Sequence, residues 1–245
     1  MGLYPDIKMK KAALIALAFT ALLCNACREE EKPKPKVIYS DKKGPEPRKD
    51  STQIKVADLP VHMEGTKYLI HPVGDIRIYD DSNRSYGSSR TSGSVSYAIS
   101  NYNRFEITGY FENLKFQHVD STALRPLSAK PLQIQTATYL STFAKRQVLV
   151  YTLVDSDTNK DGKTDSNDIR SLYVSDISGQ HFKKLSADVQ ELVDWNLIEA
   201  QGRVYFRTLE DFNKNGAFDK NDRMHYHYVD LASTEWAVTD YEPVQ

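Results

Sequence analysis

Hydrophobic and polar residues alternate in short runs along most of this chain, from Val56 to Gln245. The runs are rich in Val, Ile, Tyr, Phe and Thr, and Gly, Asn, Asp and Ser separate them, which is typical of β-strands and turns. They predict strands over 67–71, 75–79, 94–99, 104–110, 114–119, 132–137, 147–153, 170–175, 202–208, 224–229 and 235–239. Only 187–197 departs from this pattern, and its apolar positions predict a helical turn. We therefore expect an all-β domain over residues 56–245.

The N-terminus has a different pattern. Lys8, Lys10 and Lys11 precede an unbroken run of 12 small or apolar residues, 12–23. This run is too short to span a bilayer, and basic residues before such a run are typical of a secretory signal peptide. We therefore expect residues 1–26 to be a signal peptide.

The only two cysteines, Cys24 and Cys27, follow that run. Their position resembles a bacterial lipoprotein signal, in which a diacylated cysteine becomes the mature N-terminus. Cys27 is the better candidate for lipidation because small Ala26 precedes it, whereas bulky Leu23 precedes the alternative, Cys24. A plain secretory signal with two leftover thiols is the other interpretation. The resemblance implies a membrane partner: a lipid anchor in the outer membrane, facing the periplasm or the cell surface.

Residues 27–55 mix charged side chains with four prolines, a composition that forms no core and predicts a flexible, lipid-anchored tether. Without residues 1–26 the chain keeps 29 basic and 32 acidic residues, a formal charge of −3. That balance gives no electrostatic footprint for nucleic acid. Since no cysteine remains beyond Cys27, the fold must depend on an apolar core rather than on disulfides.

An internal repeat with a period of 54 residues relates 147–177 to 201–231, which overlay without a gap with 11 identities in 31 positions. Both copies contain the pattern D-x-N-x-[DN]-G-x-x-D-x-x-D. In calcium loops of the EF-hand type, oxygens at positions 1, 3, 5, 9 and 12 and the carbonyl of position 7 surround the ion, and Gly at position 6 makes the turn. The repeat therefore predicts two calcium sites, with acidic turns that serve only solubility as the alternative.

The candidate ligands of the first loop are Asp157, Asn159, Asp161, the Lys163 carbonyl, Asp165 and Asp168. Those of the second loop are Asp211, Asn213, Asn215, the Ala217 carbonyl, Asp219 and Asp222. The first loop has four carboxylates and the second three, so we expect the second to bind calcium more weakly. Asp155 and Glu210 stand beside the loops as candidate outer-shell acceptors.

Strand-like segments flank both loops, which places them at the tips of β-hairpins rather than between helices. Asp at position 12, shorter than the usual Glu, makes the loops similar to those of dockerins. In this position calcium would hold two strands in register, and a helix-opening sensor mechanism is not expected. Such sites suit the millimolar calcium found outside the cytosol.

A second resemblance covers residues 101–244. The stretch 171–186 carries an aromatic strand, Asp-x-x-Gly at a turn, then a basic residue, Leu and Ser; 115–128 follows the same plan and 227–234 a looser one. These units resemble the repeats of TolB-type, WD40-like (PD40) β-propellers. The resemblance implies a propeller-like array of antiparallel hairpin repeats, as a partial or small propeller, with a curved β-sandwich as the alternative.

No G-x-S-x-G, H-E-x-x-H or P-loop motif is present, and the sequence predicts no enzyme. His225 and His227 share one strand face, which we interpret as an exposed outer face rather than as a zinc site. We expect a non-enzymatic binding or scaffold module with a protein or glycan partner. The alternative is a surface glycan-binding or glycan-processing protein of a nutrient-uptake system.

Overall fold

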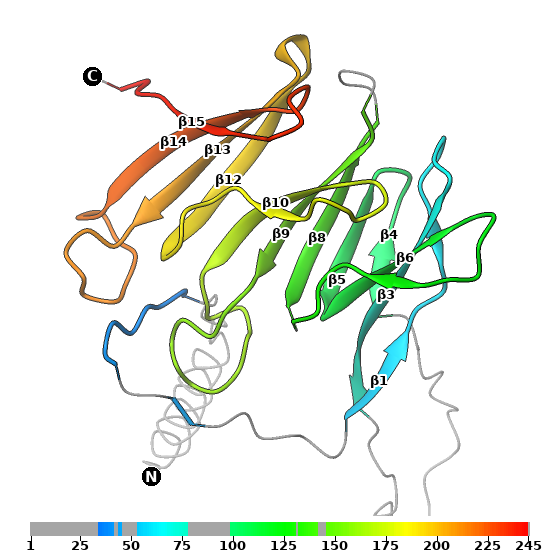
Figure 1. The fold of residues 1–245 in the computed structure, drawn as a ribbon. Helices are drawn as coiled ribbons and strands as arrows, with labels where there is room; N and C mark the ends of the chain where they lie inside the picture. The colour runs from blue at the N-terminus through cyan, green and yellow to red at the C-terminus, as the bar shows by residue number, and fades with distance from the viewer. Residues whose placement is uncertain are drawn as a thin grey trace, which may run out of the picture. The chain divides into compact units, whose positions relative to one another are not determined.

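The computed structural model describes residues 34–41, 44–45, 53–77, 99–130, 132–141 and 146–244. The predicted signal peptide, both cysteines and most of the predicted strand 94–99 lie outside these ranges. In the described residues the chain forms strands β1 to β15 and one short 3₁₀ helix, η1 (Glu199–Gln201). Neighbouring strands pair antiparallel and assemble into three sheets (Figure 1).

The first sheet has the order β1-β3-β6-β7, with β2 also paired to β3. Its strands are β1 (Gln53–Ala57), β2 (Val61–His62), β3 (Tyr68–Arg77), β6 (Asn113–His118) and β7 (Arg125–Pro126). The second sheet has the order β11-β10-β9-β8-β5-β4. Its strands are β4 (Ser100–Tyr102), β5 (Glu106–Phe111), β8 (Gln133–Leu140), β9 (Val148–Val154), β10 (Arg170–Asp176) and β11 (Lys183–Lys184).

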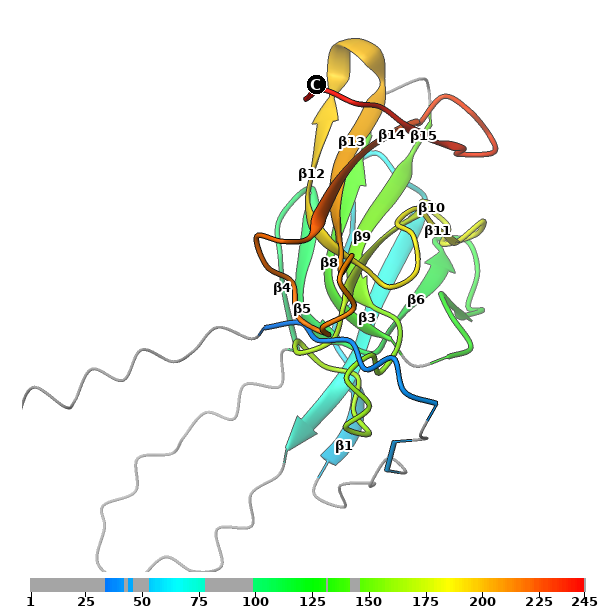
Figure 2. The same cartoon turned by 90° about the vertical axis from the view of Figure 1, so that its left-hand side faces the viewer.

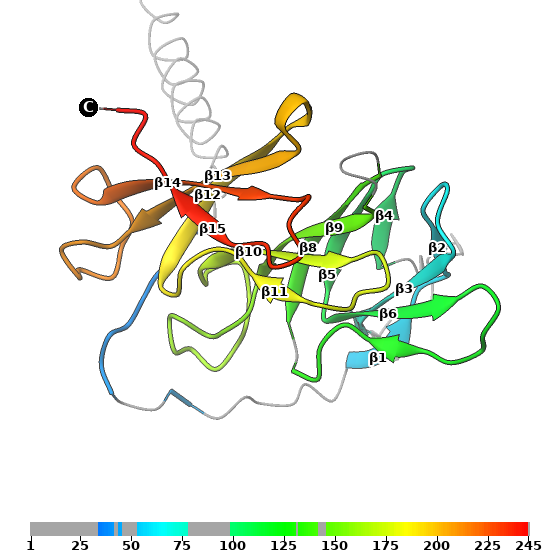
Figure 3. The ribbon, with the colours of Figure 1, turned by 45° about the horizontal axis from the view of Figure 1, so that its top comes forward.

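The third sheet is a four-stranded meander in the order β12-β13-β14-β15. Its strands are β12 (Gln190–Ile198), β13 (Arg203–Glu210), β14 (Arg223–Asp230) and β15 (Val238–Asp240). Figure 3 shows the three sheets following one another, with the second in the middle.

The second sheet carries an apolar core on each face. One core joins it to the first sheet and includes Leu149, Tyr151 and Leu153 of β9. The other joins it to the third sheet and includes Val148 and Val150 of the same strand. A strand with both faces covered needs apolar residues at consecutive positions rather than at alternate ones. This explains why the sequence of β9 is a nearly continuous apolar run.

The predicted all-β fold is confirmed, because the described residues form antiparallel sheets with almost no helix. Within these residues the three sheets close into neither a barrel nor a ring of blades. Val56, the predicted start of the domain, lies inside β1, which begins at Gln53.

The predicted helical turn at 187–197 is wrong, because the chain forms β12 there. The pairing of β12 with β13 shifts between Leu192 and Asp194. A bulge of this kind inserts one residue and breaks the strict alternation of a strand. The inserted residue is Val193, which follows apolar Leu192 directly, so that Val189, Leu192 and Val193 have the i, i+3, i+4 spacing of a helix.

We expect core residues of the middle sheet to carry much of the stability. Leu153 is fully buried, so Leu153→Ala should lower the free energy of unfolding by about 2–5 kcal/mol through lost apolar burial and a residual cavity. Leu59→Ala is the control: Leu59 is 81% exposed, and its loss should change stability by less than about 0.5 kcal/mol. Urea unfolding measures both, and equal effects would contradict the assignment of this core.

Candidate metal-binding loops and the segment between them

Both predicted calcium loops lie at the ends of β-hairpins. The first joins β9 to β10, which pair antiparallel from Val154↔Arg170 to Val148↔Asp176. The second joins β13 to β14, which pair from Glu210↔Arg223 to Arg203↔Asp230. The predicted placement on strands rather than helices is confirmed.

The two loops have the same backbone conformation. In the first, the Asp157 carboxylate accepts hydrogen bonds from the N–H groups of Asp161 (3.1 Å) and Gly162 (2.8 Å). In the second, Asp211 accepts the equivalent bonds from Asn215 (3.1 Å) and Gly216 (2.7 Å). The side chains at positions 3 and 5 also accept backbone N–H bonds in both loops.

Backbone angles repeat in the same way. The position-4 lysines have φ of 56° in both loops, and the position-6 glycines have φ of 85° and 82°. Positive φ favours glycine because other residues meet their own backbone there. Two loops that are 54 residues apart in the sequence therefore fold the same polar pattern in the same way.

The acidic residues at position 12 differ between the loops. Asp168 is fully buried, and its carboxylate accepts N–H bonds from Thr158 (2.8 Å), Asn159 (3.1 Å) and Asp165 (2.9 Å). Burial raises the pKa of Asp168, although these backbone bonds act against the rise. In the second loop one Asp222 oxygen accepts the Asp219 N–H (2.7 Å). The other, Oδ1, is buried and has no hydrogen-bond partner in the described structure.

An unpaired buried carboxylate oxygen is costly unless a donor or a cation satisfies it. Asp222 Oδ1 is such an atom, and it belongs to a predicted calcium ligand. In the described residues no group of three or more His, Cys, Asp or Glu side chains lies close enough to hold a metal. An ion in these loops would therefore also need the Asn amide oxygens and the carbonyls of Lys163 and Ala217. All-oxygen ligand sets of this kind suit calcium rather than zinc.

A segment of the predicted tether lies against both loops. The N–H groups of Lys36 and Ile38 donate to the carbonyls of Asn167 (3.0 Å) and Thr158 (2.9 Å) in the first loop. Between them, Val37 donates its N–H to the carbonyl of Gly216 in the second loop (3.0 Å). Figures 1 and 2 show this segment, residues 34–41, running past the ends of the two hairpins.

Side chains strengthen this arrangement. Val37 is buried, with 6% of its surface exposed, and the Thr158 hydroxyl donates to the Lys36 carbonyl (2.9 Å). Burial and a hydrogen bond to Asp211 raise the pKa of Tyr39 to about 12. Sequence reasoning missed these contacts, because 34–41 has the composition of a linker and most of its bonds use the backbone.

A search of protein-family models finds no match to this chain. No curated protein matches it either. In the described residues no helix is long and apolar enough to cross a membrane.

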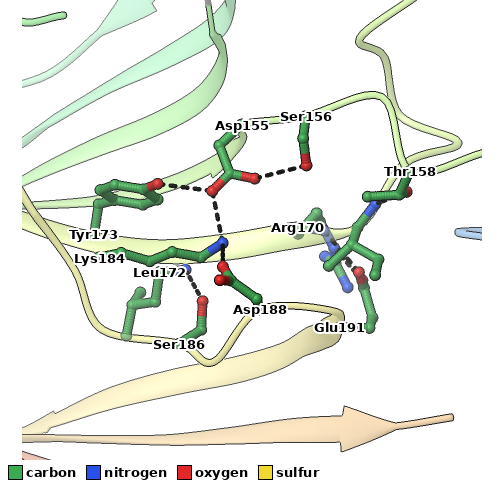
Figure 4. Close-up of polar contacts among 11 residues, drawn as sticks. Asp155, Ser156, Thr158, Arg170, Leu172, Tyr173, Lys184, Ser186, Asp188 and Glu191 are labelled. Atoms are coloured by element: carbon green, nitrogen blue, oxygen red, sulfur yellow. Dashed lines mark hydrogen bonds and ion pairs between the residues drawn. The ribbon is translucent and has the colours of Figure 1, made fainter. Parts of the chain in front are cut away.

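Asp155 belongs to a hydrogen-bonding group beside the first loop. Its carboxylate accepts bonds from the Tyr173 hydroxyl (2.7 Å) and the Lys184 ammonium (2.6 Å), as Figure 4 shows. Burial alone would raise the pKa of Asp155, but the bonds from Lys184 and Tyr173 outweigh it and lower that pKa. Figure 4 also shows Arg170, which donates to Glu191 (2.6 Å) and so ties β10 to β12.

The predicted outer-shell acceptors thus have other partners. Asp155 is bound as described above, and Glu210 contacts His225 (2.7 Å). The interpretation of both histidines as exposed is wrong for His227, which is 7% exposed. Its ring contacts Thr208 (3.0 Å) and Asp240 (2.7 Å), so this face of β14 belongs partly to the interior.

Gly216 gives a test of the contact between the 34–41 segment and the second loop. A Cβ at this position would lie 2.5 Å from the Val37 carbonyl oxygen, and φ is positive. Gly216→Ala should therefore displace the segment, and hydrogen exchange at the Val37 amide should accelerate at least about tenfold.

Gly202→Ala is the matched control for this prediction. Gly202 also has positive φ, at 63°, but no atom lies within 4 Å of a Cβ built there. The control should share the backbone strain of about 1 kcal/mol without changing exchange at Val37. Equal acceleration in both variants would contradict a direct contact.

Proposed function

We propose that this protein is a calcium-stabilised, lipid-anchored module of the cell envelope with a non-enzymatic binding or scaffold role. The calcium sites are best supported by Asp222 Oδ1, which is buried and without a hydrogen-bond partner in the described structure and stands at position 12 of a loop whose geometry the other loop repeats. A divalent cation would satisfy that oxygen.

Each loop supplies its own ligands in this proposal. In the first loop they are Asp157, Asn159, Asp161, the Lys163 carbonyl, Asp165 and Asp168. In the second they are Asp211, Asn213, Asn215, the Ala217 carbonyl, Asp219 and Asp222. Calcium bound only to the folded loops would stabilise the hairpins by mass action. Since the 34–41 segment is hydrogen-bonded to both loops, calcium that orders the loops would also order this segment.

The three stacked sheets are, in this proposal, blades of an open propeller-like array. Each hairpin that carries a loop consists of inner strands of its sheet, β9 and β10 in the second and β13 and β14 in the third. Calcium at the hairpin ends would order the chain at one end of the array. A partner would bind to other surfaces of the domain.

Calcium titration tests the metal sites. Isothermal titration should detect calcium binding, and the melting temperature should rise by several degrees when calcium replaces a chelator. The variant Asp157→Ala with Asp211→Ala removes position 1 of both loops and should abolish both effects. Proteolysis of the two hairpins should accelerate in this variant.

The control for this experiment has the same change in net charge. Asp120→Ala with Glu235→Ala alters two exposed acidic residues outside the loops, and its response to calcium should equal that of the wild type. The calcium sites are refuted when the wild type shows no heat and the same melting temperature in calcium and in chelator.

The lipid anchor has a separate test. Cys27→Ser should prevent incorporation of radiolabelled palmitate and release the protein from the membrane fraction in a Gram-negative host. Cys24→Ser should leave both unchanged, since Cys24 is the less favoured site. Labelling that persists in Cys27→Ser and is lost in Cys24→Ser would reassign the lipid to Cys24, and labelling of neither wild type nor variants would exclude the anchor.

A further inference from the structure

A cleft of about 550 Å³ lies where β3 of the first sheet approaches β4, β5 and β8 of the second. Its volume falls within the range of small-ligand sites. The cleft is remote in sequence from the two calcium loops, and none of the predicted site residues lines it.

A local irregularity of the second sheet forms the floor of the cleft. The pairing of β5 with β8 jumps from Thr108↔Thr136 to Phe111↔Ile134. Gly109 and Tyr110 on β5 therefore stand opposite the single residue Gln135 on β8. All three line the cleft. Bulges of this kind redirect side chains and are frequent beside binding sites.

Gly109 allows the strands to come together at this point. A Cβ there would lie 2.7 Å from the carbonyl oxygen of Ile99 and 3.0 Å from the Phe111 ring. A larger residue would separate β4 from β5, so the shape of the cleft depends on this glycine.

The lining combines one aromatic ring with groups that both donate and accept hydrogen bonds. Tyr110 is 69% exposed and offers a ring face and a hydroxyl. The Asn101 and Gln135 amides and the Thr108 hydroxyl can each act as donor and acceptor. Such groups match the hydroxyls of a sugar, which also donate and accept, while the ring matches its C–H face.

The charges near the cleft disfavour an anionic ligand. Asp75 lines the cleft, and burial and a hydrogen bond to the neighbouring Glu112 raise its pKa. The nearby ammonium of Lys55 is bonded to Glu112 and so is already paired. A cation would need several acceptor-only oxygens, whereas Asp75 is the one carboxyl group among the described residues that line the cleft.

We propose that this cleft binds a neutral carbohydrate, with Tyr110 stacking on a sugar ring and Asn101, Thr108 and Gln135 bonding its hydroxyls. The proposal gives the binding role put forward above a site and a ligand class. It does not require calcium.

Isothermal titration of the full chain with neutral oligosaccharides from cellulose, xylan, mannan and starch tests this site. At least one should bind, and Tyr110→Ala and Gln135→Ala should each weaken its affinity by about tenfold or more. Tyr102→Ala is the matched control, because Tyr102 is 65% exposed on the adjacent strand β4 but does not line the cleft. Its affinity should equal that of the wild type.

The proposal is overturned by the absence of binding to all four oligosaccharide types, or by an equal loss of affinity in Tyr102→Ala. Preferential binding of the anionic polymer polygalacturonate would also overturn it. Calcium is titrated separately on the same protein. Oligosaccharide binding without calcium binding would support the proposed carbohydrate site and refute the proposed calcium sites. Calcium binding without oligosaccharide binding would refute the carbohydrate site alone.

Discussion

The burial of the second sheet on both faces is the constraint on which the other features depend. Its strand β9 contributes Leu149, Tyr151 and Leu153 to one core and Val148 and Val150 to the other. The first loop and the bulge of β5 belong to this sheet, and the second loop belongs to the third sheet, which packs on it. The first loop and the cleft beside Tyr110 therefore lie on strands that cannot move without opening a core, which favours fixed geometry at both places.

The loops and the 34–41 segment form one continuous hydrogen-bonded arrangement. Gly216 is glycine for two reasons: its φ is positive, and the Val37 carbonyl lies where a Cβ would be. Val37 in turn places its N–H on the second loop while Lys36 and Ile38 contact the first. Three consecutive residues therefore connect the two loops by backbone hydrogen bonds.

The sequence predicted the fold class, the hairpin position of both loops and the equivalence of the two copies, because alternation and turn residues are local signals. It did not predict the helix-like pattern at 187–197 to be a strand, because the bulge between Leu192 and Asp194 disrupts alternation. The contacts of 34–41 use backbone groups that any sequence has. The cleft depends on the register shift between β5 and β8, and Gly109 is its one mark in the sequence. A glycine within a strand can have several structural reasons, so it does not by itself predict a cleft.

Attachment of 34–41 to the loops also limits the length of chain between Cys27 and the folded domain. When Cys27 carries the lipid, residues 28–33 alone separate it from the docked segment, and six extended residues reach about 20 Å. With the segment detached, the chain from residue 28 to the start of β1 at Gln53 would reach about 80 Å. With a lipid on Cys27, docking would hold the domain close to the bilayer, and release would let it sample a volume tens of times larger.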